Sequence, residues 1–280
     1  MSESLNRPPV IGLVAGRGRY PLLFCETARR LGVQRIVVVA MRGETDESIA
    51  DLADDVQWVH VGQIGKAIKI LRKADVPVCC FMGQVKPGRL FGDIRPDLRA
   101  AKLLFTLKEK NAESIFTGIG NEFAKDGITV LPATTYLEEF LAREGQMGKL
   151  KLKKGQVDDM ELGWRIAKEV SRMDIGQTVV VKNGTILAVE GFEGTDKCIK
   201  RGGELGKGSG ITVVKVAKPG QDMRFDVPCI GTRTVESLKT AGASALIVEA
   251  GKTLFIDMPE VLAGMDAAGI AVVGCGAAEA

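Results

Sequence analysis

The residues best suited to chemistry lie in the stretch GQDMRFDVPCIGT, residues 220–232. As an extended strand, this stretch would point Asp222, Arg224 and Asp226 to one face, because successive side chains of a strand alternate between faces. Carboxylate oxygens on such a face are ligands that a hard divalent cation such as Mg²⁺ prefers. The alternative is a solvent-exposed strand face with a weak internal ion pair. The residues alone leave both interpretations open.

A second group of acids lies in EGFEGTDKCIKRGGELGKGSG, residues 190–210. Its many glycines predict a long loop that carries Glu193, Thr195 and Asp196, and loops longer than about a dozen residues are usually functional or disordered. These carboxylates and Asp226 could jointly hold a divalent cation. The competing interpretation is a mobile surface loop.

Glycine-containing turns after three predicted strands indicate where a phosphate could bind. They are AGRGRYP (15–21), VGQIGK (61–66) and MGQVKPG (82–88). Ligands of open parallel sheets bind beyond the carboxyl ends of the strands, where such turns converge, and glycines let the backbone approach a phosphate. A dinucleotide fingerprint is absent, and tight turns are the alternative. The candidate binding residues are Ala15, Gly16, Arg17, Gly18, Gly62, Gly65, Lys66, Gly83, Gln84 and Lys86.

Histidine and cysteine usage narrows the possible chemistry. His60 is the only histidine, which excludes sites with several histidines and favours a packed strand residue over a catalytic one. The six cysteines show no CxxC pair and no zinc spacing, so buried free thiols are expected. Acid–base or metal chemistry must therefore rest mainly on Asp and Glu.

Length and composition predict a two-domain protein of the cytoplasm. A chain of 280 residues is near the limit for one core, and a net charge of +3 gives no argument for a nucleic-acid partner. The longest apolar runs are far shorter than a membrane span, and the polar start MSESLNRPP does not resemble a signal peptide.

The first half alternates β-rich runs with helical patterns, which predicts a parallel sheet with helical crossovers. The expected strands are 10–16, 35–41, 56–62, 76–83 and 128–133, and the expected helices are 21–32, 46–53, 64–75, about 97–125 and 136–142.

The stretch GQMGKLKLKKGQ, residues 145–156, is rich in glycine and lysine and predicts an interdomain linker, the alternative being a solvated charge run. We therefore expect domains at 1–147 and 148–280. In the second, Asn183-Gly184 between two β-rich runs predicts a hairpin. Helices are expected at 158–174, about 234–241 and about 259–268, and strands at 210–216, 245–251, 253–258 and 271–275.

Taken together, six segments resemble the UDP-2,3-diacylglucosamine pyrophosphatases of lipid A biosynthesis of the LpxI type over nearly the whole chain. The segments are GLVAGRGRYP, VGQIGK, FMGQVKP, DIGQTVVV, ILAVEGFEGTD and KPGQDMRFDVPCIG. The last is the most specific, through Gln221, Arg224, Asp226, Pro228, Ile230 and Gly231. Two departures from the family pattern are Arg17 in the first turn and Gln84 in the fourth-strand turn.

The resemblance implies an α/β protein with an N-terminal Rossmann-like nucleotide-binding domain and a C-terminal α/β domain of its own topology, with the active site between them. It implies Mg²⁺-dependent hydrolysis of UDP-2,3-diacylglucosamine to UMP and 2,3-diacylglucosamine 1-phosphate (lipid X). Asp226 matches the essential aspartate, and Arg224 would neutralise phosphate oxygens. Glu193 and Asp196 would complete the catalytic set, Asp226 and Asp196 would hold the metal, and Thr195 and Gln221 would contact substrate.

We further expect a homodimer that makes peripheral contact with the inner membrane. Two other functions stay open. A nucleotide-dependent oxidoreductase would bind NAD(P)H, and a non-enzymatic UDP-sugar sensor would release no UMP.

Overall fold

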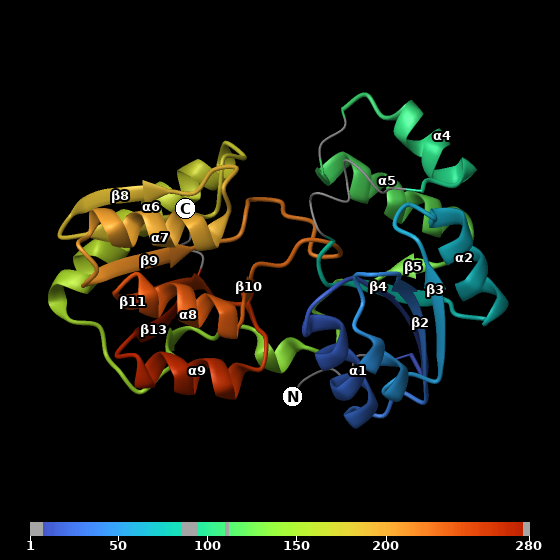
Figure 1. The fold of residues 1–280 in the computed structure, drawn as a ribbon, viewed down its shortest axis with the longest axis horizontal. Helices are drawn as coiled ribbons and strands as arrows, with labels where there is room; N and C mark the ends of the chain where they lie inside the picture. The colour runs from blue at the N-terminus through green and yellow to red at the C-terminus, as the bar shows by residue number, and fades with distance from the viewer. Residues whose placement is uncertain (1–7, 86–94, 110–111, 277–280) are drawn as a thin grey trace. The chain divides into compact units, whose positions relative to one another are not determined.

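The computed structural model describes residues 8–85, 95–109 and 112–276 (Figure 1). The chain forms two compact units. The first comprises Met1–Leu137 together with Asp222–Asp226, and the second comprises Glu138–Gln221 and Val227–Ala280. The expected boundary at 147/148 thus falls inside the second unit, and a short piece of the C-terminal half belongs to the first.

The first unit contains an all-parallel five-stranded sheet with the order β3-β2-β1-β4-β5. Apolar side chains on both faces of the central strands are buried, as is usual for a parallel sheet covered by helices. The strands are β1 (Val10–Ala15), β2 (Arg35–Met41), β3 (Asp55–Val59), β4 (Val78–Met82) and β5 (Thr129–Val130). The helices are α1 (Tyr20–Arg30), the 3-10 helix η1 (Glu47–Asp51), α2 (Ile64–Lys73), α4 (Leu98–Thr106) and α5 (Ala112–Lys125). The predicted parallel-sheet domain is confirmed.

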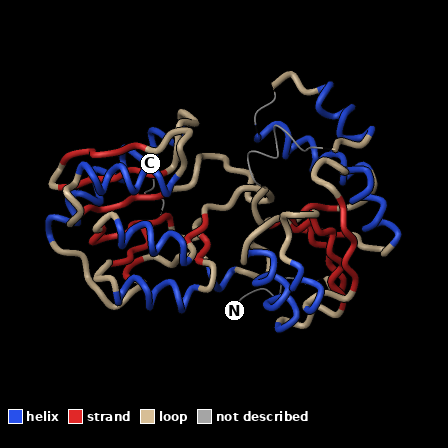
Figure 2. The backbone as a smooth tube through the Cα atoms, in the orientation of Figure 1, coloured by secondary structure: helices blue, strands red, loops and turns tan. Residues whose placement is uncertain are grey.

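The second unit contains a mixed six-stranded sheet with the order β6-β13-β11-β9-β7-β8, and a two-stranded ribbon of β10 and β12 (Figure 2). Its strands are β6 (Gly145–Gln146), β7 (Thr178–Lys182), β8 (Thr185–Val189), β9 (Ile211–Lys215), β10 (Cys229–Ile230), β11 (Ala243–Glu249), β12 (Leu254–Phe255) and β13 (Ala271–Cys275). Its helices are the 3-10 helix η2 (Glu138–Phe140), α6 (Lys154–Arg172), α7 (Thr195–Leu205), α8 (Thr232–Thr240) and α9 (Met258–Ala267). An α/β domain of this kind was expected.

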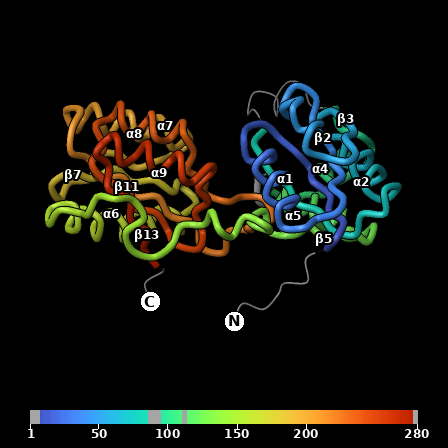
Figure 3. Tube along the Cα trace, turned by 90° about the horizontal axis from the view of Figure 1, so that it is seen from below, coloured from blue at the N-terminus to red at the C-terminus, as the bar shows by residue number. Residues whose placement is uncertain are grey.

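Two apolar clusters lie on opposite faces of this sheet. Val180 of β7 packs in the cluster with α7, α8 and α9, whereas its neighbours Val179 and Val181 pack in the cluster with α6. This alternation is the one expected for a strand buried on both faces. Figure 3 shows α6 on one side of the sheet and the other three helices on the other.

The predicted hairpin is confirmed. Asn183 and Gly184 have φ values of 49° and 71°, the left-handed pair that a type I′ turn requires. The buried carboxylate of Asp159, on α6, accepts hydrogen bonds from both of their backbone amides, at 3.0 and 2.7 Å. An element outside the hairpin therefore holds its turn.

Three of the predictions about local structure in the second unit are wrong. Gly145–Gln146 in the expected linker is strand β6, which pairs with β13, and the linker ends where α6 begins at Lys154. The helix expected over 136–142 is only the three-residue η2. The loop expected over 190–210 contains the 11-residue helix α7.

The glycines of α7 serve close packing rather than loop flexibility. A Cβ added to Gly202 would lie 2.5 Å from Val180 Cγ1, and one added to Gly203 would lie 2.6 Å from the Cβ of Ala241. Both distances are shorter than any tolerable contact between carbon atoms. These glycines let α7 lie directly on the sheet and on the end of α8.

Candidate functional site

Residues 222–226, which were expected to be extended, form a turn, whereas Cys229–Ile230 of the same stretch are strand β10. Residues 223–225 form the turn, with the Phe225 and Asp226 amides donating to the Asp222 carbonyl oxygen at 3.0 and 3.1 Å. The alternating face expected for Asp222, Arg224 and Asp226 is therefore absent. A strand there would lack a partner, whereas the turn satisfies its own backbone groups.

Aromatic packing holds this turn on the first unit. The Phe225 ring stacks on Phe116 of α5, with centroids 5.4 Å apart, and meets Phe81 of β4 edge-on at 5.2 Å. Gly120 of α5 leaves room for it, because a Cβ there would lie 3.1 Å from Phe225 Cζ. The Ala133 amide, just beyond β5, donates to the Met223 carbonyl oxygen at 2.7 Å.

Asp222 and Arg224 form an ion pair within the turn. Arg224 Nε lies 2.9 Å from Asp222 Oδ1, and Arg224 Nη2 lies 2.7 Å from Oδ2, which is the bidentate geometry that fixes a guanidinium. Hydrogen bonding to Arg224 lowers the pKa of Asp222, and the same bond raises the pKa of Arg224. Asp222 thus orients Arg224, a role that sequence reasoning did not assign to it.

Asp226 ends the turn, and its side chain is exposed. Its backbone is fixed by the bond to Asp222, and Phe225 before it is anchored among aromatic rings. A carboxylate in this position is accessible to a substrate and to water, while the turn that carries it is rigidly packed.

The turns after β1 and β4 are joined at the carboxyl edge of the first sheet. The Arg17 amide donates to the Gln84 carbonyl oxygen at 2.8 Å, and the Gln84 amide donates to the Arg17 carbonyl oxygen at 3.1 Å. A Cβ on Gly16 would lie 2.6 Å from the Gln84 oxygen, and one on Gly83 would lie 2.8 Å from the Arg17 oxygen. The two glycines thus permit the turns to meet. Lys86 lies outside the described residues.

The turn after β3 leads into α2, whose N-terminal amides were expected to bind phosphate. In the structure, the Lys66 amide donates to Oδ2 of Asp97 at 3.1 Å, and Gly65 is close enough that a Cβ would lie 3.1 Å from the same oxygen. Asp97 also caps α4 through the Ala100 amide at 3.0 Å. A protein carboxylate therefore already occupies part of this helix N-terminus. The contribution of Gly62, Gly65 and Lys66 to nucleotide binding stays a prediction.

In the second unit, Glu193 stabilises the turn that precedes α7. Its carboxylate accepts from Arg201 at 2.5 Å and from the Gly191 amide at 3.0 Å. The hydrogen bond from Arg201 lowers the pKa of Glu193 below its ordinary value. Arg201 also donates to the Val189 carbonyl oxygen at 2.9 Å, so the acid is tied to the end of β8.

Thr195 lies in a polar cluster where α7 begins. Its hydroxyl donates to Glu190 Oε1 at 3.0 Å and accepts from Lys215 Nζ at 3.3 Å. Lys215, the last residue of β9, also donates to the Cys229 carbonyl oxygen at 3.4 Å. Sequence reasoning missed this lysine, although a cation at the carboxyl end of an apolar strand was a detectable signal.

Asp196, the second predicted metal ligand, binds side chains of α8. It accepts from Arg233 Nη2 at 2.8 Å and from the Ser237 hydroxyl at 3.3 Å. These contacts link the start of α7 to α8.

Gln221, expected to contact substrate, accepts a hydrogen bond from the Lys218 amide at 2.8 Å and so fixes the turn that leads to Asp222.

The fit of these residues to a metal depends on the kind of site. Among the described residues, no group of three or more His, Cys, Asp or Glu side chains could hold a metal ion. Asp226 and Asp196 belong to different units. Mg²⁺ is commonly bound by one or two carboxylates, with substrate phosphates and water as its other ligands. The exposed Asp226 fits that kind of site, whereas the described residues do not form an all-protein cage.

The cysteines and the histidine are the other titratable candidates. All six cysteines lie within the described ranges and are free thiols, four of them buried as expected. Burial raises the pKa of Cys25 and of Cys198 to about 12, which makes them poor nucleophiles. His60 is half-buried and lies one residue beyond β3, so the expected strand position is wrong by one residue.

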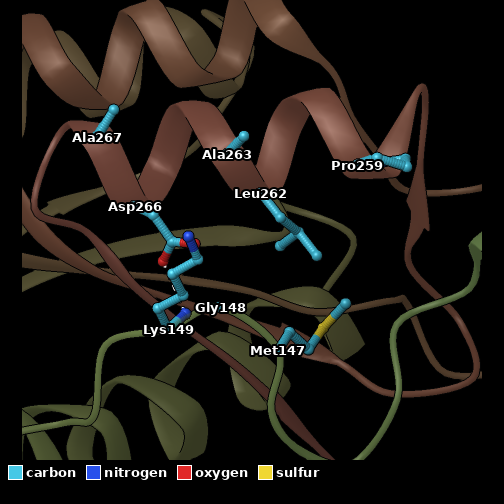
Figure 4. A pocket seen from close by; sticks show the side chains of 8 residues that line it. All are labelled: Met147, Gly148, Lys149, Pro259, Leu262, Ala263, Asp266 and Ala267. Atoms are coloured by element: carbon cyan, nitrogen blue, oxygen red, sulfur yellow. Dashed lines mark hydrogen bonds between the residues drawn. The ribbon is translucent and has the colours of Figure 1, made fainter.

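A pocket of about 630 Å³ lies between α9 and the segment after β6 in the second unit (Figure 4). Leu262 and Met147 project toward it, and Asp266 at its edge accepts from the Lys149 amide at 2.7 Å. None of the predicted site residues lines it. It is lined by Met147, Gly148, Lys149, Pro259, Leu262, Ala263, Asp266 and Ala267.

Solved structures similar to this chain are remote. The biotin carboxylase subunit of pyruvate carboxylase is 15% identical, with a TM-score of 0.26 over 65% of this chain and 38% of that one. An N5-carboxyaminoimidazole synthetase from Staphylococcus aureus is 13% identical, with a TM-score of 0.24 over 71% of this chain and 42% of that one. Scores of this size do not establish a common fold.

Similarity at the level of sequence is far stronger. Residues 10–140 match the LpxI N-terminal domain, and residues 143–273 match the LpxI C-terminal domain. The UDP-2,3-diacylglucosamine pyrophosphatase LpxI of Caulobacter vibrioides is 33% identical over 94% of this chain and 96% of its own length. The two halves follow each other in the same order, and hardly any of either chain is left unmatched. The protein described here therefore belongs to the LpxI family.

Proposed function

We propose that the protein hydrolyses the pyrophosphate bond of UDP-2,3-diacylglucosamine, giving UMP and 2,3-diacylglucosamine 1-phosphate in lipid A biosynthesis. The observation that carries this proposal is the full-length similarity to a pyrophosphatase of that name. The exposed Asp226 on a packed turn agrees with it, because a carboxylate that positions the attacking water has to be reached by both substrate and water.

In the proposed mechanism, Asp226 positions the water that attacks phosphorus, and Arg224 binds phosphate oxygens. Asp222 keeps the Arg224 guanidinium in place, so the cation needs little reorganisation when charge develops on the phosphoryl group. Glu193 and Asp196, at the start of α7, are proposed as further catalytic residues. Thr195 and Lys215 lie beside them and are proposed to contact the substrate. Gln221 positions the chain that enters the turn.

A divalent cation is proposed as cofactor, with Asp226 as its principal protein ligand and Asp196 as the second. When bound, Mg²⁺ would act as a Lewis acid that stabilises negative charge on the phosphoryl oxygens. The protein's own part is to present the Asp226 carboxylate and to orient Arg224.

The decisive experiment measures UMP release from UDP-2,3-diacylglucosamine in detergent micelles. We expect Mg²⁺-dependent release that stops on adding a chelator and resumes with excess Mg²⁺. Phosphorus NMR should show two monoesters in equal amounts. The absence of UMP would rule out the hydrolase and favour a sensor, and unchanged release in chelator would rule out the metal.

We also propose that the uridine nucleotide lies across the turns after β1, β3 and β4. Reversing the charge of Lys66, which is exposed in the first turn of α2, should then weaken UMP binding at least about tenfold, the loss expected for a hydrogen bond to a charged group. Isothermal titration of Lys66→Glu tests this.

Lys73→Glu is the matched control, because Lys73 is an exposed lysine in the last turn of the same helix. It should bind UMP within about twofold of the parent protein. Equal affinities of the two variants would place the nucleotide elsewhere.

The acyl chains are proposed to enter the second unit, where the pocket beside α9 offers the apolar walls of Leu262 and Met147. Each buried methylene contributes about 0.8 kcal/mol, so each one removed should raise KM about fourfold. Filling the pocket with Ala263→Trp, at an exposed position, should raise KM for long-chain substrate and leave KM for a dibutyryl analogue unchanged. Equal hydrolysis of UDP-N-acetylglucosamine would contradict a glycolipid substrate.

A further inference from the structure

Helix α4 exposes an apolar face to solvent. Leu98 and Phe105 have side chains 92% and 90% exposed, although both are large and apolar. Ala101 and Lys102 lie between them and are also exposed. These positions follow the i, i+3, i+4, i+7 spacing of one helix face.

The opposite face of α4 is already packed. Leu103 is buried and lies so close to α5 that a Cβ on Gly118 would be 2.7 Å from its Cδ1. Arg99 is bound to Glu122 at 2.5 Å and to Asp126 at 2.5 Å. The helix is therefore firmly seated, and its exposed face is not the result of a loose attachment.

Among the described residues, the charged side chains around the exposed face are mainly cationic. Lys102 lies on the face itself, and Arg95 and Lys108 are exposed on either side of the helix. Glu109 is the nearby exposed acid, whereas Asp97 is turned inward to cap α2 and α4. Two exposed apolar side chains with cations between and beside them are typical of a helix that lies on an anionic lipid surface.

The same helix pair also carries the candidate catalytic turn. Helix α5 contacts α4 through Gly118 and contacts the turn through Phe116 and Gly120. Helix α5 would thus link a surface bound to α4 with the turn that ends in Asp226.

We propose that the exposed face of α4 binds the surface of an anionic lipid bilayer, with Leu98 and Phe105 entering the interface and Lys102 meeting lipid phosphates. The inference deepens the proposed function, because a substrate with two acyl chains resides in a membrane. No helix in the described ranges is long and apolar enough to cross a membrane. A second copy of the chain is a poorer occupant, since a two-fold contact would bring the cations of both faces together.

The test is flotation of the full-length protein with vesicles of phosphatidylethanolamine and phosphatidylglycerol. The double variant Leu98→Ser/Phe105→Ser should bind at least about tenfold more weakly than the parent protein. Lys102→Gln should bind these anionic vesicles about fivefold more weakly than the parent protein does. To vesicles of neutral phosphatidylcholine, the variant and the parent protein should bind equally. Ile175→Ser/Leu205→Ser, which removes two exposed apolar side chains of the second unit, should bind like the parent protein.

Turnover separates this inference from the function on which it rests. In detergent micelles the α4 double variant should release UMP within about twofold of the parent rate, since α4 lies outside the proposed machinery. On vesicle-embedded substrate its rate should fall about as much as its binding. If the parent protein is active in micelles but binds no vesicles, the surface inference is wrong and the function stands. A different outcome is that the α4 double variant binds vesicles as the parent protein does but shows a lower molecular mass by light scattering. That result would overturn the surface inference and identify the α4 face as an interface between copies of the chain.

Discussion

Replacing Asp226 by asparagine should lower kcat at least about a hundredfold, the lower range for a positioned acid–base group. Asparagine keeps the size of the side chain and its backbone bond to Asp222, but it cannot accept a proton and binds a divalent cation weakly. Because the nucleotide and the acyl chains are proposed to bind elsewhere, KM and UMP affinity should change little. Steady-state UMP release at saturating substrate measures the effect.

Asp51→Asn is the control for this result. Asp51 is also an exposed acid of the first unit, at the end of η1, and its change should leave kcat within about twofold. A similar fall in both variants, or unimpaired turnover in Asp226→Asn, would contradict the catalytic assignment.

Asp222 is not a neutral control. Asp222 lies outside the residues that carry the family resemblance, so the sequence alone predicts a much smaller effect of Asp222→Ala than of Asp226→Ala. In the structure, Asp222 orients Arg224 and also accepts from the Arg224 amide at 3.1 Å. We therefore expect Asp222→Ala to give an intermediate loss, about tenfold, because Arg224 is left intact but no longer oriented.

Replacing Glu249 by alanine should destabilise the second unit by about 3–5 kcal/mol, the range for breaking a buried ion pair. Its side chain has 0% exposure and accepts from Lys168 at 3.0 Å and Lys252 at 2.8 Å. The Ala217 amide donates to it at 2.9 Å, so the loss also frees the chain that follows β9. Both lysines would be left without their common partner.

Urea denaturation followed by Trp164 fluorescence tests this, in a Trp58→Phe background that leaves α6 as the only source of signal. Glu169→Ala is the control, since Glu169 pairs with Arg172 on the exposed side of the same helix and should cost less than about 1 kcal/mol. An equal loss in the free energy of unfolding for Glu249→Ala and Glu169→Ala would mean that the buried ion pairs of Glu249 do not stabilise the second unit.

The effect of Glu249 should depend on pH. Burial works against its charged form, but hydrogen bonds from Lys252, Ala217 and Lys168 hold its pKa below the ordinary value. A carboxyl whose pKa is lower in the folded state stabilises the fold above its unfolded pKa of about 4.3. That contribution is lost as the pH falls through the folded pKa, so the gap between Glu249→Gln and the parent protein should narrow in acid.

Features that depend on neighbouring residues were predictable from the sequence. The apolar runs of β1, β2 and β4 predicted a parallel sheet, and Asn183-Gly184 predicted the hairpin. Each signal lies within a few residues of the structure that it forms.

Features that depend on distant partners were not predictable. The glycines at 202 and 203 suggested a loop because nothing in the sequence shows that Val180 and Ala241 press on them. The turn at 223–225 resembled a strand because polar and apolar residues do alternate there. In the fold, however, Phe225 packs on Phe81 and Phe116, more than a hundred positions earlier in the chain. The contact of Lys215 with Thr195 was not predictable for the same reason, although a lysine at the end of an apolar strand was itself a signal in the sequence.

The return of Asp222–Asp226 to the first unit has a consequence for synthesis on the ribosome. At about 5–20 residues per second, the chain from residue 138 to residue 226 takes roughly 5–20 s to make. During that interval Phe81 and Phe116 lack their contact with the ring of Phe225. The packing of the N-terminal unit is therefore incomplete while residues 138–226 are being translated. The nascent N-terminal half therefore exposes more aromatic surface than the finished protein until residues 222–226 have been made.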